Sequence, residues 1–91
     1  MPLYALVCRD KPGTLPIRME NRAAHLAHMQ STGVVVLAGP FVGEGGVMNG
    51  SLVVLDVAGM AEAEAWAAAD PYALAGLFGS VVISEWRRVI G

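Results

Sequence analysis

The sequence predicts one α+β domain over residues 1–91, in the order strand, helix, strand, strand, helix, strand. Three observations support this prediction. The length suits a single domain, short β-branched apolar runs alternate with two segments of helical character, and 55% of the residues are hydrophobic while 15% are charged. A chain this short buries a modest share of its surface alone, so this composition indicates burial against another chain.

The N-terminal segment predicts a strand and then a helix. Residues 3–8 form an apolar run with β character, and residues 10–13 (DKPG) supply turn chemistry. Thr14 is expected to cap the following helix, with Pro16 in its first turn. Gly33 is expected to end that helix in the left-handed conformation.

The remaining elements follow from β-branched runs, glycine-rich connections and helix formers. Residues 34–38 predict a strand closed by Gly39 and Pro40, and residues 43–50 predict a loop or hairpin connection. Alanine and glutamate favour a helix before Asp70 and Pro71 break it. The later predicted elements are a strand at 51–57, a helix at 60–69, a helical or turn segment at 71–78 and a strand at 80–89.

Three of the predicted strands are apolar at consecutive positions, in residues 34–37, 52–55 and 81–83. Side chains alternate between the faces of a strand, so both faces of the sheet are apolar. Two helices cover only one face, and a symmetric partner is the simplest cover for the other. We therefore expect a homodimer through sheet faces.

Several other classes of protein are excluded. The longest near-continuous apolar stretch, residues 34–42, is shorter than the roughly 20 residues that a spanning helix needs, and the N-terminus lacks the pattern of a signal peptide. The formal net charge is −2 without a basic stripe, which argues against nucleic-acid binding. The single cysteine, Cys8, is expected to be a buried inert thiol and suits a reducing cytoplasm, and no spacing for a metal site occurs.

The first helix carries cationic residues close to its apolar face. Arg22 falls inside that face, Arg18 and His25 lie on its edge, and His28 is expected to point to solvent. An arginine on the buried side indicates either a structural ion pair or a substrate clamp, and His25 alone indicates a core-bordering histidine. The apolar residues that define the face are Leu15, Met19, Leu26 and Met29.

Asp70 stands at the end of the alanine-rich helix, where the helix dipole disfavours negative charge. It suits the N-cap of a following segment that begins with Pro71. The alternative is a carboxylate that faces a pocket, and the two interpretations are compatible.

Four segments together resemble the motifs of the YciI-like (YCII-related) family. Residues 22–26 (RAAHL) resemble its R-x-x-H-L motif, and residues 38–40 (AGP) resemble the motif after its second strand. Residues 69–72 (ADPY) and 75–78 (AGLF) resemble a third segment, and the likeness runs in order along the chain. The chain departs at Ala23, where many members carry proline.

This resemblance implies a ferredoxin-like βαββαβ fold of the dimeric α/β-barrel type. It also implies a cleft lined by His25 and Asp70, because the matching pair of residues is regarded as the active site in such families. A related branch eliminates chloride from chlorinated hydroxyhydroquinones, whereas most members have no assigned substrate.

The resulting hypothesis is a small-molecule enzyme, lyase-like or isomerase-like, that acts on an aromatic or enolic substrate. His25 would transfer the proton while Asp70 fixes its tautomer. Arg18 or Arg22 would hold an anionic oxygen, and Ser51 with the backbone around Gly39 would add hydrogen bonds. No motif requires a metal or an organic cofactor.

Two alternatives remain open. The first is a non-catalytic dimeric module that binds a small ligand in a pocket of aromatic side chains, although such residues are more often core; the candidates are Phe41, Trp66, Tyr72 and Trp86. The second is a pure assembly partner.

Overall fold

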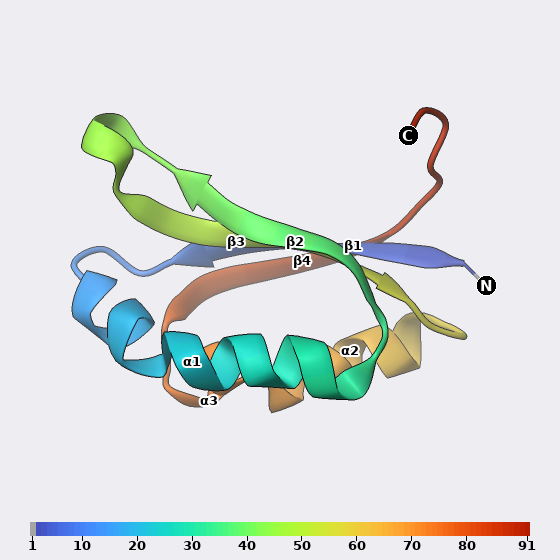
Figure 1. Ribbon diagram of the computed structural model, residues 1–91, viewed down its shortest axis with the longest axis horizontal. Helices are drawn as coiled ribbons and strands as arrows, with labels where there is room; N and C mark the ends of the chain where they lie inside the picture. The colour runs from blue at the N-terminus through green and yellow to red at the C-terminus, as the bar shows by residue number, and fades with distance from the viewer. Residues whose placement is uncertain (1) are drawn as a thin grey trace.

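The computed structural model describes residues 2–91, and it shows a four-stranded antiparallel sheet with all of its α-helices on one face (Figure 1). The strand order is β2-β3-β1-β4, so the two halves of the chain interleave as in a ferredoxin-like fold. The elements are β1 (Leu3–Asp10), α1 (Leu15–Thr32), β2 (Val35–Val42), η1 (Glu44–Gly46), β3 (Met48–Asp56), α2 (Met60–Ala69), α3 (Pro71–Leu74) and β4 (Phe78–Trp86).

The predicted order of elements is confirmed, and α2 has the predicted bounds. Gly33 ends α1 with φ 69°, the left-handed value that glycine adopts without strain. Thr14 occupies the N-cap position of α1, but its side chain makes no capping hydrogen bond; its hydroxyl instead donates to the carbonyl of Lys11.

The strands are longer than predicted at several ends. Strand β2 continues through Gly39 and Pro40 to Val42, where we expected it to close. It can do so because β2 is an edge strand, and an edge strand tolerates a residue that lacks an N–H group. Strand β1 likewise extends to Asp10, a residue assigned above to a turn.

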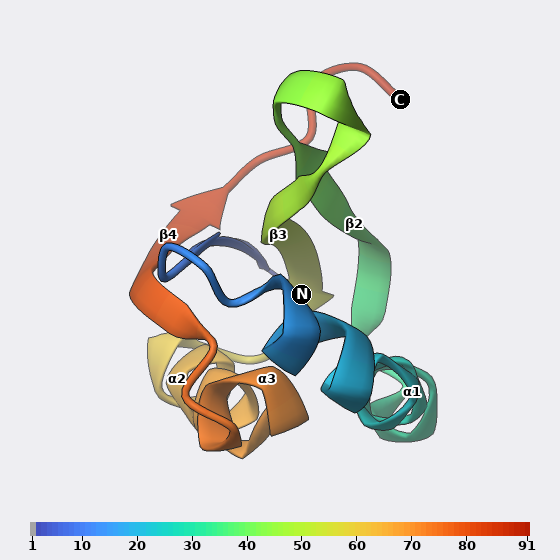
Figure 2. The ribbon, with the colours of Figure 1, turned by 90° about the vertical axis from the view of Figure 1, so that its left-hand side faces the viewer.

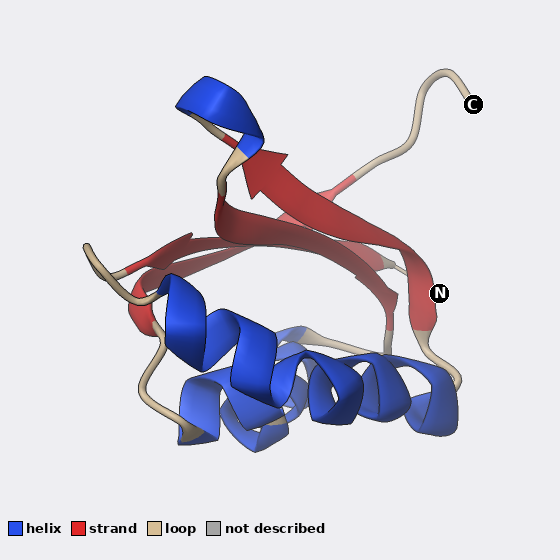
Figure 3. Ribbon diagram, turned by 60° about the vertical axis from the view of Figure 1, so that its left-hand side comes forward, coloured by secondary structure: helices blue, strands red, loops and turns tan. Residues whose placement is uncertain are grey.

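The hydrophobic core lies between the two central strands and α2. Strand β1 contributes Tyr4 and Leu6, strand β3 contributes Val53 and Leu55, and α2 contributes Trp66. Figure 3 shows α1, α2 and α3 as one layer beneath the sheet. The only fully buried residues of α1 are polar, namely Arg18 and His25, so this helix turns a polar side toward the sheet.

The predicted inward face of α1 is therefore wrong in part. Leu15, Met19 and Leu26 are 38%, 53% and 37% exposed, whereas Met29 is half-buried against the core. Hydrogen bonds of Arg18 and His25 fix the rotation of α1 in place of an apolar face. The spacing of hydrophobic residues identified α1 correctly but did not identify which side of the helix faces the sheet.

The second face of the sheet has no α-helix over it (Figure 2). Register places Leu37 opposite Val54 and Leu52 opposite Val7 on this face, and Val82, which pairs with Val7, is 58% exposed. The β2–β3 connection and the C-terminal residues rise on the same side as this face (Figures 1 and 2). The apolar second face is thus present as predicted.

No helix within residues 2–91 combines the length and the apolar character that crossing a bilayer requires.

Candidate functional site

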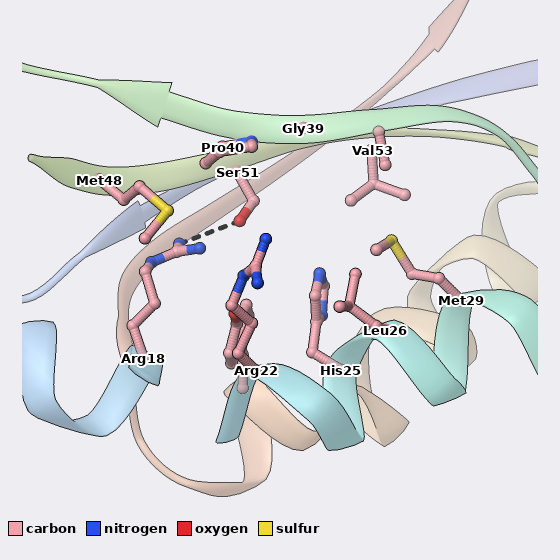
Figure 4. Close-up of a pocket in the computed structure, with 12 residues that line it drawn as sticks. Arg18, Arg22, His25, Leu26, Met29, Gly39, Pro40, Met48, Ser51 and Val53 are labelled. Atoms are coloured by element: carbon pink, nitrogen blue, oxygen red, sulfur yellow. Dashed lines mark hydrogen bonds between the residues drawn. The ribbon is translucent and has the colours of Figure 1, made fainter. Parts of the chain in front are cut away.

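The site lies between α1 and the β2–β3 half of the sheet. Arg18, Arg22 and His25 are four and three residues apart, so they project from one side of α1. Figure 4 shows these three side chains pointing from the helix toward the strands, where Ser51 and Val53 point back at them. The helix supplies charged and titratable groups, and the sheet supplies a largely apolar wall with one hydroxyl.

Arg18 forms a buried ion pair with Asp10, the last residue of β1. Its Nε donates to Oδ2 at 2.7 Å and its Nη2 to Oδ1 at 2.9 Å, a bidentate geometry in which both side chains are 3–5% exposed. Nη2 also donates to Ser51 Oγ at 3.0 Å. Burial acts to lower the pKa of Arg18, but the hydrogen bonds and charge of Asp10 outweigh it and raise that pKa, so the guanidinium stays charged.

His25 and Asp70 are in direct contact across α1 and the junction between α2 and α3. His25 Nδ1 lies 2.8 Å from Asp70 Oδ1, and the two side chains are 7% and 3% exposed. The same Oδ1 accepts the backbone N–H of Tyr72 at 3.0 Å, which caps α3. Since a carboxylate oxygen only accepts, Nδ1 carries a hydrogen, and in the neutral imidazole Nε2 then has the lone pair.

The ring of Tyr72 contacts both His25 and Arg18. Its ring stacks on the imidazole of His25, with centroids 4.0 Å apart and planes at 13°, and the guanidinium carbon of Arg18 lies 4.7 Å from its centroid. Burial raises the pKa of Tyr72, although the charges of Arg18 and Arg22 oppose this. The stack and the bond to Asp70 together hold the His25 ring in one orientation.

These groups surround a pocket of about 200 Å³. That is smaller than the ~300–1,000 Å³ of pockets for drug-sized ligands, so it has room for a molecule of roughly one ring. Its lining residues are Arg18, Arg22, His25, Leu26, Met29, Ala38, Gly39, Pro40, Met48, Ser51, Val53 and Tyr72. Within residues 2–91, no group of three His, Cys, Asp or Glu side chains is arranged to hold a metal ion.

The structure brings the predicted site residues together, but the burial of Arg18 and Arg22 is the reverse of the prediction. Arg18, expected on the edge, is the buried arginine with the ion pair, whereas Arg22, expected inside, is exposed at the pocket. Ser51 presents its hydroxyl, and Gly39 contributes backbone only. Of the aromatic candidates for a ligand pocket, Tyr72 lines it and Trp66 belongs to the core.

The prediction that His28 points to solvent is wrong. Its Nε2 lies 3.2 Å from the carbonyl oxygen of Trp66, and its ring packs on the indole at 4.5 Å. The imidazole thus contacts both the backbone and the ring of Trp66 in α2, so His28 has a structural partner. It does not line the pocket.

Sequence reasoning missed Asp10 and the part that Tyr72 plays. The apolar run ends at Cys8, so the sequence predicts a turn at Asp10, and nothing local indicates its pairing with Arg18. A usable indication was the buried arginine itself, which requires a carboxylate. Tyr72 was noted only as an aromatic residue, although its position two residues after an N-cap aspartate predicts the backbone hydrogen bond to Asp70.

Cys8 lies beside Ser51 in the sheet and provides a pH-dependent prediction. Burial, with a smaller contribution from the charge of Asp70, raises the pKa of its thiol from 9.0 to about 12. The folded protein should therefore resist alkylation by iodoacetamide at pH 8–9, and denaturant should abolish this protection. Equal labelling of folded and unfolded protein would contradict this protection.

The thiol also affects the pH dependence of stability. Because the pKa of Cys8 is higher in the folded than in the unfolded protein, its contribution to the free energy of unfolding is complete below about pH 9 and is lost as the pH rises from about 9 to 12.

Comparisons with known proteins agree with this architecture. The sequence model of the YCII-related domain matches residues 2–87. Protein YciI of Escherichia coli O6:H1 is 34% identical, with 96% of this chain and 98% of that protein covered. An uncharacterised protein of Haemophilus influenzae is 31% identical, with 94% and 97% covered.

Among solved structures, the 5-chloro-2-hydroxyhydroquinone dehydrochlorinase of Burkholderia phenoliruptrix AC1100, in complex with 2,5-dihydroxybenzoquinone, has a TM-score of 0.88. It is 30% identical, and 93% of each chain is covered. An antibiotic biosynthesis monooxygenase has a TM-score of 0.61 at 9% identity, with 99% and 100% covered. The second likeness concerns the fold alone.

Proposed function

Because this chain belongs to the family of YCII-related domains, we propose that it is a small-molecule enzyme in which His25 transfers a proton on an aromatic or enolic substrate. The observation that carries this proposal is the contact between His25 Nδ1 and Asp70 Oδ1 at 2.8 Å beside a pocket of about 200 Å³. A histidine whose one nitrogen is fixed by a carboxylate is oriented as a general base at the other.

The chemistry follows from the tautomer. Nε2 of His25 accepts the proton of a ring hydroxyl, and Asp70 stabilises the imidazolium that forms. Return of the proton to a ring carbon gives the keto tautomer, an isomerisation. If that carbon bears chlorine, loss of chloride together with a second hydroxyl proton gives a quinone and HCl. No external oxidant is needed, since the chloride leaves with the electron pair that the ring gives up.

A dehydrochlorinase at 30% identity with a TM-score of 0.88 supports a substrate of this kind. The test is anaerobic incubation of the protein with 5-chloro-2-hydroxyhydroquinone, with free chloride and the quinone absorbance measured in parallel. Stoichiometric release of chloride that depends on the protein supports the proposal. If the compound binds without chloride release or tautomerisation, and binding survives replacement of His25 by alanine, the non-catalytic binding module is the better description.

We also propose that the protein forms a homodimer through the second face of the sheet. Apolar side chains gather on that face, which the helices leave uncovered, and a twofold partner covers it with the same residues. A change of Val82 to glutamate places a charge in this interface and should shift the sedimentation coefficient to that of a monomer. The matched change of Met19, similarly exposed on the helix side, should leave a dimer; a wild-type monomer at micromolar concentration would contradict the proposal.

A further inference from the structure

We infer that the Asp10–Arg18–Ser51 chain fixes Ser51 as a hydrogen-bond donor to the ligand, so that the pocket selects compounds that carry a carbonyl or oxyanion oxygen across from an acidic hydroxyl. This inference rests on the proposed use of the pocket, and it names the substrate class and the residues that select it. It assigns Asp10 as a positioning residue and Ser51 as a specificity residue.

The direction of the hydrogen bonds follows from their chemistry. A guanidinium has donors and no acceptor, so in the 3.0 Å contact Arg18 Nη2 donates and Ser51 Oγ accepts. The serine hydrogen then points elsewhere. Within residues 2–91 this contact is the one hydrogen bond that the Ser51 side chain makes, and the residue lines the pocket, so its O–H is free to donate there.

Asp10 keeps this donor polarised without adding net charge. The bidentate pair holds both ends of the guanidinium in one plane, which fixes Nη2 on Ser51 Oγ. The carboxylate cancels the arginine charge nearby, while the Nη2–H bond still draws electron density from the hydroxyl oxygen. Such a preorganised dipole stabilises negative charge on a ligand oxygen.

The two walls of the pocket then require two different ligand groups. Ser51 on β3 offers a donor, and His25 on α1 offers an acceptor at Nε2 (Figure 4). A conjugated hydroxy-carbonyl compound satisfies both, since removal of its hydroxyl proton moves negative charge onto the carbonyl oxygen. A ring with hydroxyls alone leaves the Ser51 donor with a weaker acceptor.

The test compares two one-ring probes by isothermal titration calorimetry. 2,5-Dihydroxybenzoquinone carries carbonyl and acidic hydroxyl groups, and hydroquinone carries hydroxyls alone. A change of Ser51 to alanine should weaken binding of the first about 10- to 100-fold, which is the loss expected for a hydrogen bond to a charged acceptor, and of the second less than about 3-fold. A change of Ser51 to threonine keeps the hydroxyl and should restore the preference.

The outcomes are separable from those of the enzymatic proposal. A selective loss in the alanine variant supports the inference even when no chloride is released from the chlorinated compound, a result that would count only against catalysis. An equal loss for both probes, no loss for either, or no binding of 2,5-dihydroxybenzoquinone by the wild type at millimolar concentration would overturn the inference. Thermal unfolding of each variant, at a midpoint close to that of wild type, shows that the comparison is made on folded protein.

Discussion

Replacement of His25 by glutamine is expected to lower kcat/KM for the substrate about 10²- to 10⁴-fold, the usual contribution of a positioned proton-transfer group. Glutamine approximates the size of imidazole but cannot take a proton near neutral pH. Replacement of Asp70 by asparagine should also lower kcat/KM, because the neutral amide oxygen can accept the same two N–H groups but carries no charge to stabilise the imidazolium. Both variants are measured by initial rates of chloride release.

The chain offers a matched control for this experiment in His28, three residues along the same helix. Its imidazole also meets a fixed acceptor, the carbonyl oxygen of Trp66, but it lies outside the pocket. The change of His28 to glutamine should leave kcat/KM within a few-fold of wild type. Equal losses at both histidines would assign the effect to the helix, and full activity without the His25 imidazole would remove the proton-transfer role.

Replacement of Asp10 by leucine should lower the free energy of unfolding by about 3–5 kcal/mol, because it leaves the buried Arg18 without its counter-ion. That is a large share of the ~5–15 kcal/mol that stabilises a typical domain. The double change of Asp10 to leucine and Arg18 to methionine should recover much of the loss, since no buried charge remains. Urea titrations of the single and double variants at one protein concentration measure these differences.

Asp56 provides the control, because it also ends a central strand but is exposed. Its change to leucine should alter the unfolding free energy by no more than about 0.5 kcal/mol. If the change of Asp10 costs no more than the change of Asp56, the pair of Asp10 and Arg18 does not contribute to stability in the way its geometry indicates.

The order of the elements was accessible from the sequence because it depends on local patterns. Helix α2 was predicted from its alanine and glutamate content and its Asp70–Pro71 end, and both bounds agree. The extension of β2 through Pro40 was not accessible, because it depends on β2 being an edge strand. The rotation of α1 is likewise set by partners outside the helix, namely Asp10, Ser51 and Asp70.

For the candidate site, helix geometry and the family motifs both drew attention to His25 and Asp70, and the structure places His25 Nδ1 2.8 Å from Asp70 Oδ1. The helical pattern placed Arg22 inside and Arg18 on the edge, which is the reverse of the structure, because the ion pair with Asp10 buries Arg18. The contact of Ser51 with Arg18 depends on the folded chain, so no local sequence pattern indicates it. Residues that also shape the backbone, such as Asp70, could be recognised from the sequence.

Oδ1 of Asp70 accepts hydrogen bonds from both the Tyr72 amide and the His25 imidazole. Protonation of His25 is therefore linked to the hydrogen bond that caps α3. When His25 becomes an imidazolium, its hydrogen bond to Oδ1 strengthens, and the hydrogen bond from the Tyr72 amide to the same oxygen weakens. The backbone ¹⁵N–¹H resonance of Tyr72 should then follow the protonation of its neighbour. A main-chain nucleus of ¹⁵N-enriched protein thus reports the side-chain equilibrium without any substrate.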